Sequence, residues 1–335
     1  MATFAMRSAV VTVVLSILPL LAGAPACAFT KLWVAKSGVD SPSCGAVASP
    51  CATFQRAHDN ISAGGEIGVL TPGDYGVPTN PVTAGIFISK SVSITSDTVG
   101  EAGILNTSSL SVAVNIDAAA SDVVGLRGLV LDGLGAGAKG IQASHLSALH
   151  VQNCVIRNFE GSSSPYGIAT LSTSGRIALF VSDTLIYNNG SASNSGGILL
   201  GAMGGSISAV LDRVRLENNV IGLNVLNLGA ATDNFRVTVR DTTISGNAGD
   251  GIVASTNGVS STVVLVERSA AVNNTGSGLH ADGARALILL GDSIITNNST
   301  GVSRTNGGQL ISYGDNRNHN NVGDEGTASA TFSLF

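Results

Sequence analysis

The chain has 335 residues, of which 44% are hydrophobic, 12% charged and only 4% aromatic, and its formal net charge is −5. A chain this apolar is not disordered, and it lacks the basic patch with interleaved aromatic residues that is typical of nucleic-acid binding. The low charge and the 42 glycines favour a fold whose exposed positions are often small.

The first 28 residues have the pattern of a secretory signal. Arg7 supplies the positive charge, residues 10–21 form an apolar stretch that is short for a membrane span, and Ala28 ends a small-x-small cleavage pattern. We therefore expect cleavage near Ala28, secretion to the periplasm or the outside of the cell, and no membrane span. An uncleaved anchor is the alternative.

Residues 29–65 are expected to form an N-terminal strand, a disulfide loop and a short capping helix. Cys44 and Cys51 flank a Gly/Ala/Ser/Pro loop in an exported chain, so we expect a disulfide between them. Apolar residues at helical spacing predict the helix over residues 52–62. The remaining cysteine of the mature chain, Cys154, takes a position held by Thr or Ser elsewhere and is expected to be a small buried residue.

A repeat runs from about Ala148 to Asn321. Each copy has two apolar residues flanking an outward one, then a polar pair and an Asn or Gly-Asn pair. The copies shorten along the chain: Asn188 follows Asn158 by 30 residues, whereas Asn320 follows Asn297 by 23. Helical repeats need roughly 33 residues or more. Alternating aliphatic residues separated by Gly, Asn, Ser and Asp favour strands and turns instead.

These repeats predict an all-β fold, a β-solenoid in which strands stack in register from coil to coil. We expect residues 66–323 to form one right-handed parallel β-helix, because parallel crossovers strongly prefer that hand. Residues 324–335 would be a tail or a C-terminal cap. One interior column is predicted from the second apolar residue of each copy: Val151, Val181, Leu211, Val239, Val266 and Leu290.

The start of this region resembles a known group of proteins. A helix, then Gly-Gly-Glu-Ile ending at Ile67, then Pro-Gly-Asp-Tyr ending at Tyr75, is similar to the entry of secreted right-handed parallel β-helix proteins of the pectin-lyase-like superfamily. The later coils resemble the generic repeat of that group, and the resemblance covers most of residues 31–323. It implies the fold but not the function, because the superfamily contains lyases, hydrolases, esterases, adhesins and inert scaffolds.

The polar pair of each copy is the candidate site. Stacked by coil, its charged residues alternate in sign: Asp183, Asp212, Arg213, Arg240, Asp241, Glu267 and Arg268. The favoured interpretation is a salt-bridge ladder that fixes the register of the coils. The alternative is a row that binds a charged or hydroxylated glycan. Asp183 and Asp241, two coils apart, would then lie near the upper limit of the roughly 6.5–9.5 Å between the carboxyls of inverting glycosidases.

The Asn pairs and the histidines point to structure rather than chemistry. Asn tolerates left-handed turn geometry and can hydrogen-bond along its own stack, so the pairs predict an Asn ladder. The five histidines share no column and have no metal-ligand spacing. The sequence therefore predicts neither a metal nor a cofactor.

The motifs leave catalysis open and favour a non-catalytic protein. The hydrolase and pectate-lyase motifs of the superfamily are not found in the sequence, and its lysines do not cluster. The leading hypothesis is a secreted protein that binds extracellular polysaccharide or the cell surface, or serves there as a scaffold. One alternative is a polysaccharide lyase or glycoside hydrolase with its site on the coils between residues 153 and 268. The other is a structural adhesin.

One outward face is unexpectedly apolar, at Val263, Leu265, Leu287 and Leu289. An apolar face of this kind is either covered by another part of the chain or prone to bind other molecules. We expect either a loop or residues 330–335 to fold back over it, or these four residues to form a self-association or flat binding surface.

Overall fold

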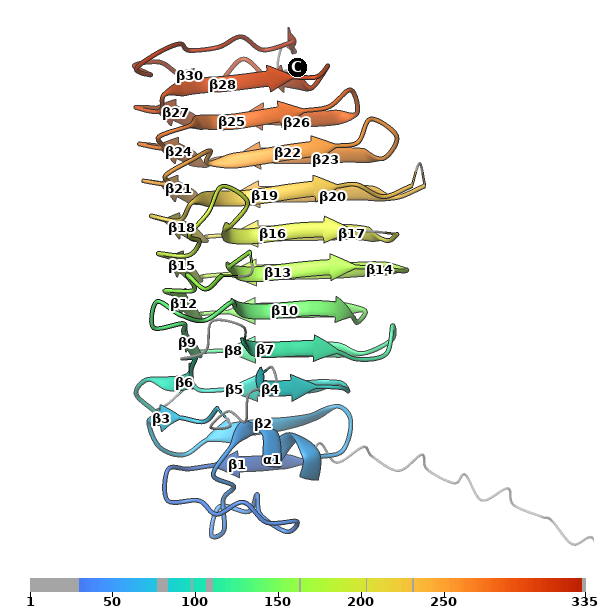
Figure 1. Ribbon diagram of the computed structural model, residues 1–335, viewed down its shortest axis with the longest axis vertical. Helices are drawn as coiled ribbons and strands as arrows, with labels where there is room; N and C mark the ends of the chain where they lie inside the picture. The colour runs from blue at the N-terminus through green and yellow to red at the C-terminus, as the bar shows by residue number, and fades with distance from the viewer. Residues whose placement is uncertain are drawn as a thin grey trace, which may run out of the picture.

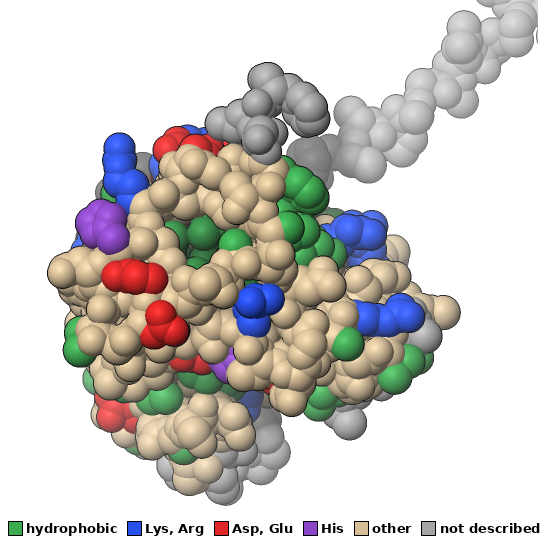
Figure 2. Space-filling model, turned by 90° about the horizontal axis from the view of Figure 1, so that it is seen from above, with side chains coloured by type: hydrophobic (Ala, Val, Ile, Leu, Met, Phe, Trp, Pro, Cys, Tyr) green, Lys and Arg blue, Asp and Glu red, His purple; other side chains and the backbone are tan. Residues whose placement is uncertain are grey.

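The computed structural model describes residues 30–76, 84–97, 99–106, 111–162, 164–202, 204–230 and 232–332. The predicted signal and its cleavage site lie outside the described residues. The described chain forms a rod in which one coil stacks on the next from the N-terminal to the C-terminal end (Figure 1). Seen along the rod, a group of hydrophobic side chains lies in a hollow of the end face, and the charged side chains lie outside that hollow (Figure 2).

Three parallel sheets run the length of the rod. The 12-stranded sheet, called the long sheet below, contains in order β1 (Lys31–Val34), β2 (Gly65–Val69), β5 (Val92–Thr95), β8 (Val123–Arg127), β11 (Ala148–Gln152), β14 (Arg176–Ser182), β17 (Ser206–Asp212), β20 (Asn234–Arg240), β23 (Ser261–Glu267), β26 (Ala286–Gly291), β29 (Gln309–Ser312) and β31 (Ala330–Thr331).

The ten-stranded sheet contains β3 (Gly73–Asp74), β6 (Ala102–Leu105), β9 (Val130–Asp132), β12 (Val155–Arg157), β15 (Leu185–Tyr187), β18 (Arg215–Glu217), β21 (Thr243–Ser245), β24 (Ala270–Val272), β27 (Ile294–Thr296) and β30 (Arg317–Asn318). The nine-stranded sheet contains β4 (Ala84–Ile88), β7 (Val112–Asp117), β10 (Lys139–His145), β13 (Tyr166–Ser172), β16 (Gly196–Ala202), β19 (Ile221–Asn227), β22 (Ile252–Thr256), β25 (Ser277–Asp282) and β28 (Thr300–Thr305). The prediction of an all-β parallel solenoid is thus confirmed.

The interior column predicted from the repeats is also confirmed. Val151 pairs with Val181, and the register continues through Leu211, Val239, Val266 and Leu290. Each of these side chains is at most 2% exposed. Because identical positions stack at about 4.8 Å, aliphatic side chains of one coil fill the gaps left by the next.

The helix α1 (Phe54–Asn60) lies at the N-terminal end of the rod (Figure 1). Thr53 caps it, because its side-chain oxygen accepts a hydrogen bond from the backbone N–H of Arg56. Phe54, Ala57 and His58 are buried on its inner side. The sequence predicts a longer helix, over 52–62, but the backbone is already extended at Thr53 and at Ile61.

The long sheet extends beyond residues 66–323 at both ends. β1 pairs with β2 at the N-terminal end. Near the C-terminus, Ala330 and Thr331 pair with Ile311 and Ser312 as one more strand. Residues 330–332 therefore continue the sheet and do not fold back over its outward face, contrary to that expectation. Among the described residues, no helix is long and apolar enough to cross a membrane.

An Asn ladder fills the corner after the ten-stranded sheet. The first residue of each Asn pair has a positive φ, as at Asn188 (54°) and Asn218 (53°). The second residue is buried and bonded to its equivalents: Asn219 accepts from the backbone N–H and the side-chain amide of Asn189, at 3.1 and 3.0 Å. It also donates to the carbonyl of Ile186 at 3.0 Å. The ladder thus pairs polar groups that would otherwise be unsatisfied inside the rod.

Replacing Val181 by Asp should destabilise the protein by more than about 4 kcal/mol, because the substitution buries an unpaired charge. The matched change Ala178→Asp places the same charge on the outward side of the same strand and should cost less than about 1 kcal/mol. Urea denaturation of both variants measures the difference. Equal losses would contradict the assigned interior column.

Asn219→Ala should destabilise the protein by about 2 kcal/mol, because it leaves the buried donors of Asn189 without their acceptor. Thr238→Ala, on an outward position of β20, serves as the control. A loss no larger than that of the control would mean that the ladder is not a source of stability.

The predicted disulfide between Cys44 and Cys51 is present, with 5.0 Å between the two Cα atoms. Burial raises the pKa of the Cys154 thiol to about 11, so this residue should not react in the folded protein. Thiol labelling of the mature, unreduced protein should therefore modify no cysteine when folded and one when denatured. Three labelled cysteines would refute the disulfide.

Candidate functional site

Each central coil turns from the long sheet to the ten-stranded sheet through one residue in the left-handed conformation. The φ angles of this corner column lie between 42° and 53° at Asn153, Asp183, Arg213, Asp241, Arg268 and Asp292. Asn and Asp adopt this conformation readily, but Arg does so rarely. The corner aims these side chains outward at one edge of the long sheet, so the candidate polar residues gather there.

The first cluster joins four of the predicted site residues. Arg213 donates hydrogen bonds to both carboxylate oxygens of Asp183, at 2.7 and 3.0 Å, and also contacts Asp212. Arg240 donates to the other oxygen of Asp212 at 2.8 Å. Asp212 is only 7% exposed, so a buried carboxylate lies between two guanidinium groups.

The second cluster joins the other three. Arg268 donates to both carboxylate oxygens of Asp241 at 3.0 Å, and it pairs with Glu267 at 3.0 Å. Each arginine is bound mainly to a carboxylate one coil earlier, so both clusters tie neighbouring coils together. Among the described residues, no ion pair connects the two clusters.

Hydrogen bonds from arginine determine how the corner carboxylates titrate. Arg213 holds the pKa of Asp183 below its ordinary value, and Arg268 does the same for Asp241. A general acid needs a raised pKa near the working pH. These two carboxylates, which the sequence suggested as an inverting pair, are therefore unsuited to donate a proton.

A shallow hollow of about 450 Å³ lies beside the second cluster. Asp241 and Arg268 form one wall, and Asp292, Asp315 and Arg317 continue it toward the C-terminal end. Asp292 ends the column of polar pairs in the sequence, but sequence reasoning missed Asp315 and Arg317, because the repeat becomes more polar and shorter there. The left-handed corner was also missed, although its Asn and Asp residues are a recognisable signal.

The outward face of the long sheet carries a second set of functional groups. His150 and Phe180 are adjacent in register and stack with their ring centroids 4.7 Å apart. Phe180 is 40% exposed. Beside His150, the missing side chain of Gly125 leaves a hollow of about 150 Å³ that Arg127 and Gln152 border.

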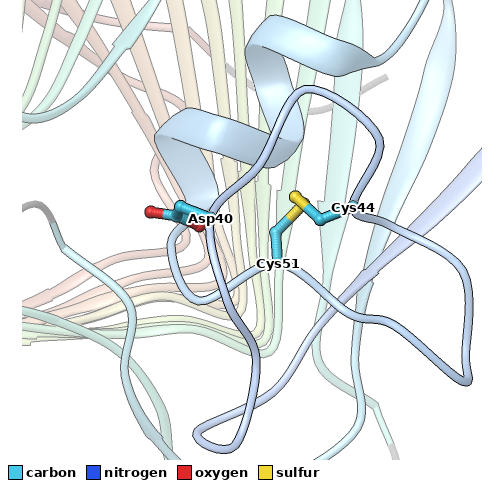
Figure 3. A group of neighbouring side chains, drawn as sticks. All are labelled: Asp40, Cys44 and Cys51. Carbon is cyan, nitrogen blue, oxygen red and sulfur yellow. A yellow bond between two sulfur atoms is a disulfide. The ribbon is translucent and has the colours of Figure 1, made fainter.

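The N-terminal loop brings Asp40 close to Cys44 and Cys51, the one group of three that has metal-ligand proximity among the described residues. Figure 3 shows the two sulfur atoms joined in the disulfide. The Asp40 carboxylate accepts hydrogen bonds from the backbone N–H of Ala52, at 2.8 Å, and from the backbone and hydroxyl of Thr53. These atoms stabilise the entry to α1 and are not free to bind an ion.

Acid should weaken the coils that the corner clusters tie together. Because the pKa values of Asp183 and Asp241 are lowered in the folded state, their stabilisation is present above about pH 4 and is lost as the pH falls through the folded pKa values. Denaturation from pH 5 to 2 should show this loss in the wild type and a flatter profile in Asp183→Asn/Asp241→Asn. Asp315→Asn is the control, and identical profiles for wild type and double variant would contradict the assignment.

Comparison with known proteins identifies the fold. No protein-family model matches the sequence, and no curated protein matches it. Among solved structures, the pectate lyase Pel9A has a TM-score of 0.53 at 16% identity, over 85% of this chain and 68% of that one. A rhamnogalacturonan lyase has a TM-score of 0.53 at 16% identity, over 80% and 74%. This chain therefore shares the fold of these two lyases, a right-handed parallel β-helix.

Proposed function

We propose that the protein is a secreted, non-catalytic polysaccharide-binding β-helix whose ligand lies on the outward face of the long sheet. The observation that carries this proposal is the stacked pair of His150 and Phe180 beside the hollow over Gly125. The fold neighbours support the ligand class, because both are lyases named for a polysaccharide. The disulfide between Cys44 and Cys51 is consistent with export.

The pair has the features that sugar binding requires. An aromatic ring presents a large apolar surface that can lie against the C–H face of a sugar ring. Arg127 and Gln152, next to the hollow, add donors and an acceptor for hydroxyl groups. The face is open along the rod, so an extended chain can cross several coils.

The chemistry of the corner clusters favours binding over catalysis. Asp183, Asp212 and Asp241 are each bound by an arginine, and none is placed as a free acid or base. The alternative is a lyase or hydrolase at the hollow that Asp292, Asp315 and Arg317 border. There the described residues give Asp292 and Asp315 no ion-pair partner, which is the specific observation that keeps this alternative.

A glycan-array screen of the wild type should identify a polysaccharide ligand. Phe180→Ala should weaken the binding of that ligand by about tenfold, because it removes the aromatic surface under the sugar. The matched control is Phe87→Ala on the nine-stranded sheet, since Phe87 is 42% exposed and Phe180 is 40% exposed. Titration calorimetry measures both. Equal losses of affinity in the two variants, or no loss in Phe180→Ala, would contradict binding at the proposed face.

Catalysis is tested on the same polysaccharide ligand. Reducing-sugar and unsaturated-uronate assays should detect no product after prolonged incubation with the wild type. Product that disappears in Asp292→Asn/Asp315→Asn would replace the binding proposal by the enzyme alternative.

Self-association is a second candidate role, favoured by the apolar outward patch of Val263, Leu265, Leu287 and Leu289. These residues pair in register on β23 and β26, and each keeps part of its surface exposed. Leu265→Glu/Leu289→Glu should convert an oligomer to a monomer in sedimentation velocity, because it places charges in an apolar contact. Ile294→Glu, at an exposed position of the ten-stranded sheet, is the control. A wild type that sediments as a monomer would defeat this role.

A further inference from the structure

The long sheet has two edges with opposite electrostatic character. At the corner edge, arginines alternate with carboxylates and are bound by them. At the other edge, where the chain enters the long sheet from the nine-stranded sheet, Arg176 and Arg285 lie at the same register position, and Arg236 lies two residues further along its strand. We call these three residues the arginine row.

The guanidinium groups of the arginine row have no ion pair or side-chain hydrogen bond to any described residue. All three side chains are exposed. The nearest acidic residues in sequence are Asp233, three residues before Arg236, and Asp282, three residues before Arg285. Asp233 is only 8% exposed and accepts from the backbone N–H of Ala230 at 2.8 Å. Asp282 accepts from the hydroxyl of Thr305 at 2.8 Å and from the amide of Asn306 at 2.7 Å. The row is therefore a strip of uncompensated positive charge on a protein whose net charge is −5.

The row repeats at every second coil. Its members belong to β14, to β20 and to the turn just before β26, and one strand of the long sheet separates each from the next. Along the rod, two strand spacings amount to about 10 Å, and Arg236 is also displaced from the other two by two residues, about 7 Å, along the strand direction. The spacing along the rod is comparable with the length of a disaccharide, so a linear chain parallel to the rod could present one charged group to each arginine.

Two hollows coincide with the row. One, of about 230 Å³, is lined by Arg176, Ser206, Asn234 and Arg236. The other, of about 240 Å³, is lined by Arg285 together with Ser261, Val263, Leu287 and Gln309. Each hollow thus combines a guanidinium group with hydroxyl or amide side chains.

We propose that the arginine row binds a linear acidic polysaccharide that runs along the rod, with an anionic group on alternate sugars. This inference rests on the proposed glycan-binding face and names its ligand class. Arginine binds carboxylate and sulfate groups through paired N–H donors. Ser206, Asn234, Ser261 and Gln309 supply partners for sugar hydroxyls. A nucleic acid is disfavoured, because no aromatic side chain that could stack on its bases lines either hollow.

The test compares matched polymers on the full mature protein. Hyaluronate fragments, with one carboxylate for every two sugars, should bind more tightly than the same fragments after carboxyl reduction, and binding should weaken as salt increases. Dextran sulfate and dextran form the second arm and distinguish a sulfate ligand from a carboxylate ligand. Tighter binding of the acidic member in either arm supports the proposal.

The variant Arg176→Gln/Arg236→Gln/Arg285→Gln should lose at least about tenfold in affinity for the acidic polymer and most of its salt dependence. Its unfolding midpoint should not change, because these side chains have no partner in the described structure. The control Arg56→Gln/Arg215→Gln/Arg317→Gln removes the same charge from other surfaces and should keep the affinity.

Equal losses in the two triple variants would overturn the row as a site. Equal binding of acidic and reduced polymers would overturn the acidic ligand but leave the proposed glycan face intact. Failure of the wild type to bind any polysaccharide would overturn both. Tighter binding to a single-stranded oligothymidylate of equal charge would replace the polysaccharide by nucleic acid.

Discussion

The stacking of parallel coils at about 4.8 Å is the constraint on which the rest of the structure depends. It places each side chain directly between its equivalents in the coils before and after. A position that suits an interior aliphatic residue therefore suits one in every coil, as in the column through Val181 and Leu211. A buried polar residue needs a hydrogen-bond partner inside the rod, and stacking can supply an equivalent residue for it, as Asn219 does for Asn189.

The same constraint governs charge on the surface. Like charges in one column would repel at this spacing, so carboxylates and guanidiniums alternate at the corner edge. Asp183 with Arg213, and Asp241 with Arg268, are the result. This pairing lowers the pKa of both aspartates, which disfavours them as general acids. At the opposite edge, the arginine row has no carboxylate partner among the described residues, and we propose that its charge is available to a ligand.

Most of the fold could be predicted from the sequence, because alternation and coil length repeat. The register of Val151 with Val181 follows from aligning the copies, and so does the alternating charge of the corner. The arginine row could not be predicted in the same way. Arg176 begins its strand, Arg236 is the third residue of β20 and Arg285 lies in a turn, so only the register across loops of different length brings Arg176 and Arg285 level with each other and Arg236 within two residues of them.

The outward face of the long sheet is therefore the surface on which the functional account depends. A crystal structure of the protein with a bound acidic oligosaccharide tests this claim most directly. The account predicts a glycan parallel to the rod, with its anionic groups at Arg176, Arg236 and Arg285 and a sugar ring against Phe180. A glycan bound across the nine-stranded sheet, or in the hollow beside Asp292 and Asp315, would contradict it.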